Sequence, residues 1–258
     1  MMPPLTPPII AVDIGNSSIK FGRFEVILPM QLPEPTWVAS FPTSHDFSPE
    51  TFSDLPASIR WRVASVQREA EVRLANWVQK HRPQDDYQQL SYRDLPLNVA
   101  LPQPEKVGLD RLAAAVAANA LREQTRAAIV VSAGSALTIN LISPAGAFLG
   151  GSILPGFRMS AQALASATDL LPLALLETAA EPPPALGQST AAAIRSGLFW
   201  GAVGAVREII ARYSMTHPHP NLFVTGGDLQ RLAPLMGDQA CFVPNLVLTG
   251  IALATLQD

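Results

Sequence analysis

Two acidic residues stand beside glycines in settings that suit phosphate chemistry, and the first is Asp13. It follows the apolar run Ile9–Val12 and opens a turn, Asp13–Ser18, that contains one glycine and small polar residues. Such a turn offers backbone N–H groups and hydroxyls to a phosphate, and a carboxylate at a strand end suits hydrated Mg²⁺, which prefers oxygen ligands. The alternative role for Asp13 is a hydrogen bond to the turn backbone, as aspartates often make.

The second acidic residue is Asp110, in the segment VGLDR at the start of a stretch rich in alanine and leucine. Gly108 permits close backbone approach, and the N-terminus of a helix favours an anion. Asp110 can therefore cap the helix or act as a general base that takes a hydroxyl proton during phosphoryl transfer. Arg111 suits a phosphate or carboxylate contact or a surface ion pair, and Lys20 suits a phosphate contact or a solvated strand face.

Three further features give weaker signals. The segment FVTGGDL has two glycines after a strand, which suits close approach of a nucleotide base or ribose. His217 and His219 are separated by a proline in an expected loop, which disfavours a metal pair, and Cys241 is expected to be a small buried hydrophobic residue. The chain has neither GxxxxGK[ST] nor GxGxxG, so its phosphate site differs from those two glycine-rich types.

The elements that position these residues alternate between strands and helices. Apolar patterning and turn residues predict strands in 9–26 (a hairpin), 36–41, 59–66, 127–157 (three strands) and 221–227. Helices are predicted over 68–81, 108–124, 157–168, 190–213, a short segment from Asp228, and 244–258. This alternation indicates an α/β protein.

An internal echo indicates that the α/β unit is duplicated. VDIGNSSIKFG near the start and VSAGSALTINL near the middle both show a strand, a small turn with glycine, and a second strand. Two unrelated hairpins would give the same short match, but each half also continues into α/β alternation. We therefore expect two domains, 1–120 and 121–258.

Composition excludes several function classes. The 258 residues are 48% hydrophobic and carry a net charge of -3, which gives no electrostatic footprint for nucleic acid or an anionic membrane. The single cysteine permits no intramolecular disulfide, and no apolar stretch reaches the length of a membrane span. The N-terminal segment lacks the features of a secretory signal, so a cytosolic enzyme is expected.

Six motifs occur together in order along the chain: DIGNSSIK, GLDR, SAGSALT, GGSILPGFRMS, STAAAIRSG and TGGD. With them the whole chain resembles type III pantothenate kinase, a family of the acetate kinase/Hsp70/actin superfamily. The resemblance implies duplicated actin-like (ribonuclease H-like) domains with a central cleft. It implies ATP-dependent phosphorylation of pantothenate to 4'-phosphopantothenate, the first step of coenzyme A biosynthesis. It also implies a cytoplasmic homodimer that requires Mg²⁺ and a monovalent cation, K⁺ or NH₄⁺.

The same resemblance implies roles for individual residues. It makes Asp110 the catalytic proton acceptor, lets Asp13 hold Mg²⁺ through water, and makes Ser135 an ATP contact. The first ATP-phosphate loop then comprises Asp13, Ile14, Gly15, Asn16, Ser17, Ser18, Ile19 and Lys20. The pantothenate contacts comprise Leu101, Gly108, Leu109, Asp110, Arg111 and Thr190.

Two positions depart from the family pattern. Ser132 stands where the family usually has an aspartate that helps hold the monovalent cation, and a neutral hydroxyl should hold K⁺ less well. Leu101 stands where an aromatic residue commonly contacts the substrate. These departures leave open a catalytically weak regulatory relative that binds nucleotide, or a kinase for a different alcohol. Asp13, Asp110 and Arg111 favour a catalyst, since a scaffold has no need of them.

Overall fold

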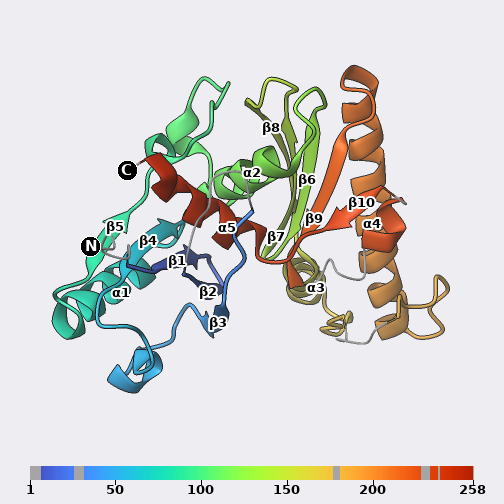
Figure 1. Ribbon diagram of the computed structural model, residues 1–258. Helices are drawn as coiled ribbons and strands as arrows, with labels where there is room; N and C mark the ends of the chain where they lie inside the picture. The colour runs from blue at the N-terminus through green and yellow to red at the C-terminus, as the bar shows by residue number, and fades with distance from the viewer. Residues whose placement is uncertain (1–6, 26–31, 177–180, 228–232, 238, 258) are drawn as a thin grey trace. The chain divides into compact units, whose positions relative to one another are not determined.

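The computed structural model divides the chain into two compact units. It describes residues 7–25, 32–176, 181–227, 233–237 and 239–257. The first unit combines Met1–Leu121 with Asn245–Asp258, and the second consists of Arg122–Pro244 (Figure 1). Each unit is built around one five-stranded mixed sheet.

The sheet of the first unit has the order β3-β2-β1-β4-β5. Strands β1, β2 and β3 are antiparallel neighbours, whereas β4 and β5 continue the sheet in the direction parallel to β1. The strands span Ile9–Ile14 (β1), Ser18–Phe24 (β2), Trp37–Pro42 (β3), Arg60–Ser65 (β4) and Asp86–Gln89 (β5).

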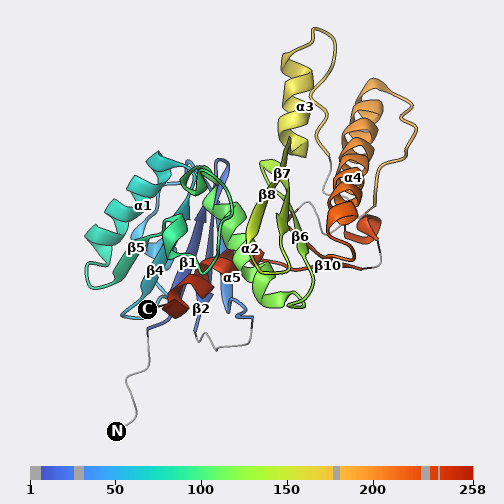
Figure 2. The same cartoon turned by 90° about the horizontal axis from the view of Figure 1, so that it is seen from above.

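Alternating side chains give this sheet two different faces. Val12, Ile14 and Phe21 pack with Leu74 and Trp77 of α1 in one hydrophobic cluster. Helices α2 and α5 contact the sheet through β1, β2 and β4, and Figure 2 shows α1 on one side of the sheet and these two helices on the other. The helices span Arg68–His81 (α1), Leu109–Leu121 (α2) and Leu246–Leu253 (α5).

The last residues of the chain correct the predicted domain boundary. The sequence assigned 245–258 to the second domain, but the structure assigns Asn245–Asp258 to the first unit. Helix α5 lies beside α2 (Figure 1), and at Gly250 a Cβ atom would lie only 1.8 Å from the carbonyl oxygen of Ala113. The two helix backbones therefore touch, and the strongly apolar α5 is buried there rather than in the unit that precedes it in sequence.

The second unit repeats the topology of the first. Its sheet has the order β10-β9-β6-β7-β8, with β6 antiparallel to β7 and parallel to β9. Strands β6, β7, β8, β9 and β10 thus correspond in turn to β1, β2, β3, β4 and β5, so the α/β fold is duplicated as the sequence predicted. They span Ala128–Ala133 (β6), Ala136–Ile142 (β7), Phe148–Pro155 (β8), Asn221–Thr225 (β9) and Ala240–Phe242 (β10).

One face of the second sheet is covered by α4. Val131, Ile139 and Val224 of the sheet share a hydrophobic cluster with Phe199 and Val203 of this helix. The helices span Phe157–Ser166 (α3) and Thr190–Thr216 (α4). Short 3-10 helices in the two units cover Pro49–Phe52, Tyr92–Asp94, Pro104–Lys106, Ala233–Met236 and Ala254–Gln257. None of the described helices combines the length and apolar character that crossing a membrane requires.

Three details test the element predictions further. The predicted helix over 68–81 is confirmed at both ends as α1. The short strands β5 and β10 were missed, and the short helix predicted from Asp228 lies outside the described residues. Cys241 is exposed, not buried as predicted, because it lies on a three-residue strand at the edge of the sheet.

Candidate active site

The turn between β1 and β2 forms the first part of the candidate site. The N–H of Gly15 donates to the carbonyl oxygen of Ser18 at 2.9 Å, which closes the turn. The N–H of Val66 donates to the carbonyl oxygen of Ile14 at 3.0 Å and fixes the strand that leads into it. Asn16 and Ser17 at the tip are exposed, so the turn presents polar groups to solvent.

Asp13 is held between charged neighbours at the end of β1. Its partners in register are Lys20 on β2 and Ala64 on β4. Burial raises the pKa of the Asp13 carboxyl from 3.8 to about 6; the positive charge of Lys20 opposes this rise and the negative charge of Asp110 adds to it. The fold of the first unit therefore brings Lys20 and Asp110 close enough to Asp13 for their charges to act on its carboxyl, although Asp110 is far from Asp13 in sequence.

Asp110 lies in the first turn of α2, where the N-terminal partial charge of the helix stabilises a carboxylate. The N–H groups of Arg111 and Leu112 both donate to the carbonyl oxygen of Gly108, at 3.1 and 3.3 Å. A Cβ atom at position 108 would lie 2.5 Å from Asp110 Oδ1, so the carboxylate folds back over this glycine. A side chain at position 108 would therefore displace the Asp110 carboxylate from this position.

The turn between β6 and β7 is the corresponding part of the second unit. The N–H of Gly134 donates to the carbonyl oxygen of Ala136 at 3.0 Å, and the N–H of Gly156 donates to that of Ser135 at 3.1 Å. Ser135 is half-buried at this turn. In the same unit, Thr190 is the exposed first residue of α4, whose N-cap is Ser189.

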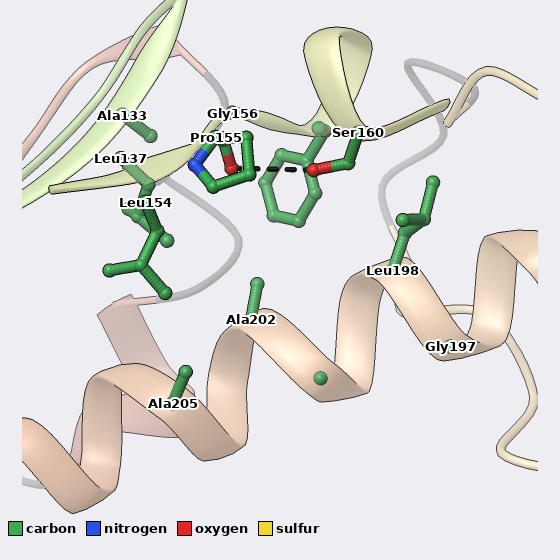
Figure 3. A pocket seen from close by; sticks show the side chains of 12 residues that line it. Ala133, Leu137, Leu154, Pro155, Gly156, Ser160, Gly197, Leu198, Ala202 and Ala205 are labelled. Carbon is green, nitrogen blue, oxygen red and sulfur yellow. Dashed lines mark hydrogen bonds between the residues drawn. The ribbon is translucent and has the colours of Figure 1, made fainter. Parts of the chain in front are cut away.

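An apolar cavity of about 190 Å³ lies beside this second turn. It is enclosed by the ends of β6, β7 and β8, the start of α3 and one side of α4 (Figure 3). Ser160 adds a hydroxyl, which donates to the carbonyl oxygen of Pro155 at 3.4 Å. Carbon atoms form most of the wall, from Ala133, Leu137, Leu154, Phe157, Leu198, Ala202 and Ala205.

Comparison with known protein families shows which family the chain belongs to. The model of the type III pantothenate kinase family matches residues 9–212. The chain belongs to the type III pantothenate kinase family. A relative from Alkalilimnicola ehrlichii named type III pantothenate kinase is 31% identical over 95% of this chain and 97% of its own length. One from Legionella pneumophila with the same name is 31% identical over 97% of this chain and 99% of its own.

Solved structures show the same fold. A Campylobacter jejuni protein named for the Baf family of transcriptional activators covers 97% of this chain and 98% of its own, with a TM-score of 0.61 and 22% identity. A Sinorhizobium meliloti protein named for 2-dehydro-3-deoxygalactonokinase covers 98% and 99%, with a TM-score of 0.56 and 13% identity. At these identities the likenesses concern the fold alone, so the first of them does not favour a regulatory role.

For a type III pantothenate kinase, the predicted site residues divide between the two units. The first unit contains the turn residues 13–20, the 108–111 segment and Leu101, which is half-buried in the loop before the 3-10 helix Pro104–Lys106. The second unit contains Ser132, Ser135 and Thr190. The contacts of these residues with ATP or pantothenate stay predictions.

A kinase of this family uses ATP with a divalent metal, and the carboxylates of the first unit suit one. Asp13 and Asp110 are two oxygen donors with like charge, and their mutual repulsion would be relieved by a cation. Among the described residues no group of three or more His, Cys, Asp or Glu could hold a metal. Two carboxylates suit hydrated Mg²⁺, which keeps several of its waters and usually takes only one or two protein carboxylates.

The monovalent cation that the sequence resemblance implies has less support from the residues of this structure. Ser132 is paired in register with Thr138 on β7 and Thr225 on β9. Because residues directly opposite each other share a face, these three hydroxyls form a neutral row at the end of β6. The equivalent row in the first unit is Lys20, Asp13 and Ala64. The Ser132 row thus supplies no carboxylate for K⁺ or NH₄⁺.

Sequence reasoning missed two residues near the first turn. Thr43 hydrogen-bonds the turn itself, and Arg73 hydrogen-bonds Thr43. Thr43 is buried and follows β3, and both its backbone and its side chain hydrogen-bond the turn. Arg73, on α1, donates to the carbonyl oxygen of Thr43. No sequence motif identifies these residues, because a single threonine after a strand is common and its hydrogen-bond partners are distant in sequence.

Proposed function

We propose that this protein transfers the γ-phosphoryl group of ATP to pantothenate, giving 4'-phosphopantothenate and ADP, the first step of coenzyme A biosynthesis. Family membership supports this substrate pair. The observation that carries the proposal is the electrostatic contact between Asp13 and Asp110 in the first unit, beside a polar turn. Two like charges held near each other lower stability, and ionisable groups perturbed in this way are found preferentially at functional sites.

In this mechanism Asp110 accepts the proton of the primary hydroxyl of pantothenate. The freed oxygen attacks the γ-phosphorus, and the bond to the bridging oxygen of ADP breaks. The turn residues 14–18 and Lys20 hold the phosphates, so that catalysis is mainly positioning and charge stabilisation. Bound Mg²⁺ would neutralise charge on the phosphate oxygens, and Asp13 would hold it through water.

The family motifs also imply roles for two residues of the second unit. Ser135 contacts ATP, and Thr190 contacts pantothenate at the start of α4, as the family motifs imply. Leu101 and the 108–111 segment line the pantothenate site, and the guanidinium of Arg111 suits the substrate carboxylate.

The proposed working form is a cytoplasmic homodimer, as the family resemblance implies. Light scattering coupled to size-exclusion chromatography would measure its mass. A mass near twice 27.6 kDa supports the dimer, and a mass of one chain at enzyme assay concentrations contradicts it.

Substitution of Asp110 tests the mechanism. We expect Asp110→Asn to lower kcat by at least about 100-fold, because a general base contributes about 10²–10⁴-fold and the amide cannot take the proton. ADP release would be measured with and without pantothenate, and circular dichroism would verify folding. Asp54→Asn, at an exposed carboxylate of the same unit, is the control and should keep full activity. Near-normal turnover by the Asp110 variant would remove Asp110 from the mechanism.

A further inference from the structure

Thr43 makes two hydrogen bonds to the first turn. Its N–H donates to the carbonyl oxygen of Ser17 at 3.1 Å, and its Oγ1 donates to that of Gly15 at 3.0 Å. Thr43 is only 9% exposed, so water has little access to its hydroxyl. One residue on the neighbouring strand end therefore fixes two of the peptide groups that form the turn.

The bond to Gly15 also sets the direction of an N–H group. In a planar trans peptide the carbonyl and the following N–H point in opposite directions. The carbonyl of Gly15 points toward Thr43, so the N–H of Asn16 points away from it. A rotation of this peptide would move the N–H of Asn16, and with it one of the groups that a turn of this kind offers to an anion.

The duplicated fold separates the role of the Thr43 side chain from that of its backbone. In the first unit β2 pairs Ser18 with Pro42, and in the second β7 pairs Ala136 with Pro155. The next residues, Thr43 and Gly156, each donate a backbone N–H to a turn carbonyl. The backbone bond thus belongs to the fold, whereas the hydroxyl bond occurs only in the first unit, because Gly156 has no side chain.

Arg73 holds Thr43 from the other side. Its Nη2 donates to the carbonyl oxygen of Thr43. Its Nε lies 3.9 Å from Asp46 Oδ1, and the Asp46 side chain is 92% exposed, so that ion pair is weak. The stronger link of Arg73 is therefore the one to Thr43, and it connects α1 to the turn through a single residue.

We propose that Thr43, supported by Arg73, is a positioning residue that orients the first turn for the phosphates of ATP. This inference rests on the proposed function only in taking the turn as a nucleotide site, and it makes no use of the phosphoryl acceptor. Thr43 acts through Gly15 and Ser17 and does not itself contact the reacting atoms.

The test removes one hydrogen bond and keeps the shape of the side chain. Thr43→Val loses the Oγ1 donor and retains the N–H. We expect the Kd for a non-hydrolysable ATP analogue with Mg²⁺, measured by calorimetry without pantothenate, to rise about 3- to 10-fold, the effect of one net hydrogen bond. The KM for ATP should rise alike while the KM for pantothenate stays constant. Thr43→Ser restores the donor and should bind within about twofold of the unaltered protein.

Thr36→Val is the matched control, because it removes the same kind of bond from the far end of the same strand pair. Thr36 Oγ1 donates to the carbonyl oxygen of Arg23 at 3.2 Å, away from the turn. This variant should bind the analogue normally. Arg73→Met acts on the turn only through Thr43, so we expect it to raise the Kd for the analogue by a smaller factor than Thr43→Val does. This second variant tests the proposal even if Thr43→Val folds poorly.

A purely structural role for Thr43 predicts a lower melting temperature with an unchanged Kd in the folded fraction, and that result would overturn the proposal. Failure of the unaltered protein to bind the analogue would overturn it too. If the protein binds ATP and Thr43→Val weakens that binding, but pantothenate is not phosphorylated, the proposed function fails while this inference stands.

Discussion

Replacing Asp13 by asparagine should change how the stability of the nucleotide-free protein depends on pH. The folded protein binds a proton on Asp13 more tightly than the unfolded chain does, because burial and Asp110 raise the pKa of this carboxyl to about 6. Asp13 therefore favours folding below about pH 4, and this contribution is lost as the pH rises through about 6. Asparagine has nearly the same shape as aspartate and cannot ionise, so the stability of the variant does not fall through ionisation at this position as the pH rises.

The size of the effect follows from the pKa. A rise from 3.8 to about 6 corresponds to about 3 kcal/mol, since each tenfold change in proton affinity is worth about 1.4 kcal/mol. At pH 4 the unfolded carboxyl is already partly ionised, so the free energy of unfolding of Asp13→Asn, relative to the unaltered protein, should be about 2–3 kcal/mol more favourable to the folded state at pH 8 than at pH 4. In melting temperature this amounts to about 4–12 °C.

Urea unfolding between pH 4 and 8, in EDTA and without nucleotide, would measure the difference. Tryptophan fluorescence reports mainly on the first unit, which contains Trp37, Trp61 and Trp77, whereas Trp200 lies in the second. All other ionisable groups are the same in the two proteins. Subtracting one plot of unfolding free energy against pH from the other therefore gives the contribution of Asp13. Parallel pH profiles for the two proteins would refute the conclusion that the ionised Asp13 carboxylate destabilises the folded protein.

Two further substitutions test the packing of the helices and the cation site. Gly250→Ala should destabilise the first unit by at least about 1–3 kcal/mol in urea unfolding, because its Cβ would lie 1.8 Å from the Ala113 carbonyl oxygen. Gly204→Ala, on α4 with no atom within 4 Å of the added Cβ, should be neutral or stabilising; equal losses would contradict this account. Ser132→Asp should make catalysis depend on K⁺ more strongly than in the unaltered protein, in assays with K⁺ or Na⁺ as the only monovalent ion. If the unaltered protein is inactive without K⁺, the neutral row of Ser132, Thr138 and Thr225 is sufficient for K⁺ binding, and the prediction is wrong.

Much of the fold could be predicted because local patterns and tertiary packing agree. In α1 the spacing predicts one apolar helix face made of Val72, Leu74, Trp77 and Val78. The last three of these residues are buried in the structure, whereas Val72 is exposed, so that part of the prediction was wrong. The turns at Gly15 and Gly134 were recognised because glycine and small polar residues between two apolar runs leave few alternatives. The duplication followed from the similarity of these two segments.

What the sequence could not predict depends on contacts between distant residues. The apolar composition of α5 indicates burial, but not that its partner is α2 of the first unit. Thr43 bonds to Gly15 across 28 positions, and neither residue type marks the pair. Cys241 follows the apolar trend of its neighbours, yet it is exposed because β10 is a short edge strand. Each of these features is fixed by topology and not by periodicity.

The duplication also indicates why Asp13 is charged. If the fold itself required a carboxylate at the end of the first strand of each unit, the second unit would have one too. There Ser132 occupies the equivalent place between Thr138 and Thr225, and the sheet forms with the same strand order and pairing. The destabilisation that ionised Asp13 imposes above about pH 6 is thus not a requirement of the architecture. This destabilisation is what the proposed role of Asp13 in holding Mg²⁺ would lead us to expect, because Asp110 lies within electrostatic reach of it in the same unit.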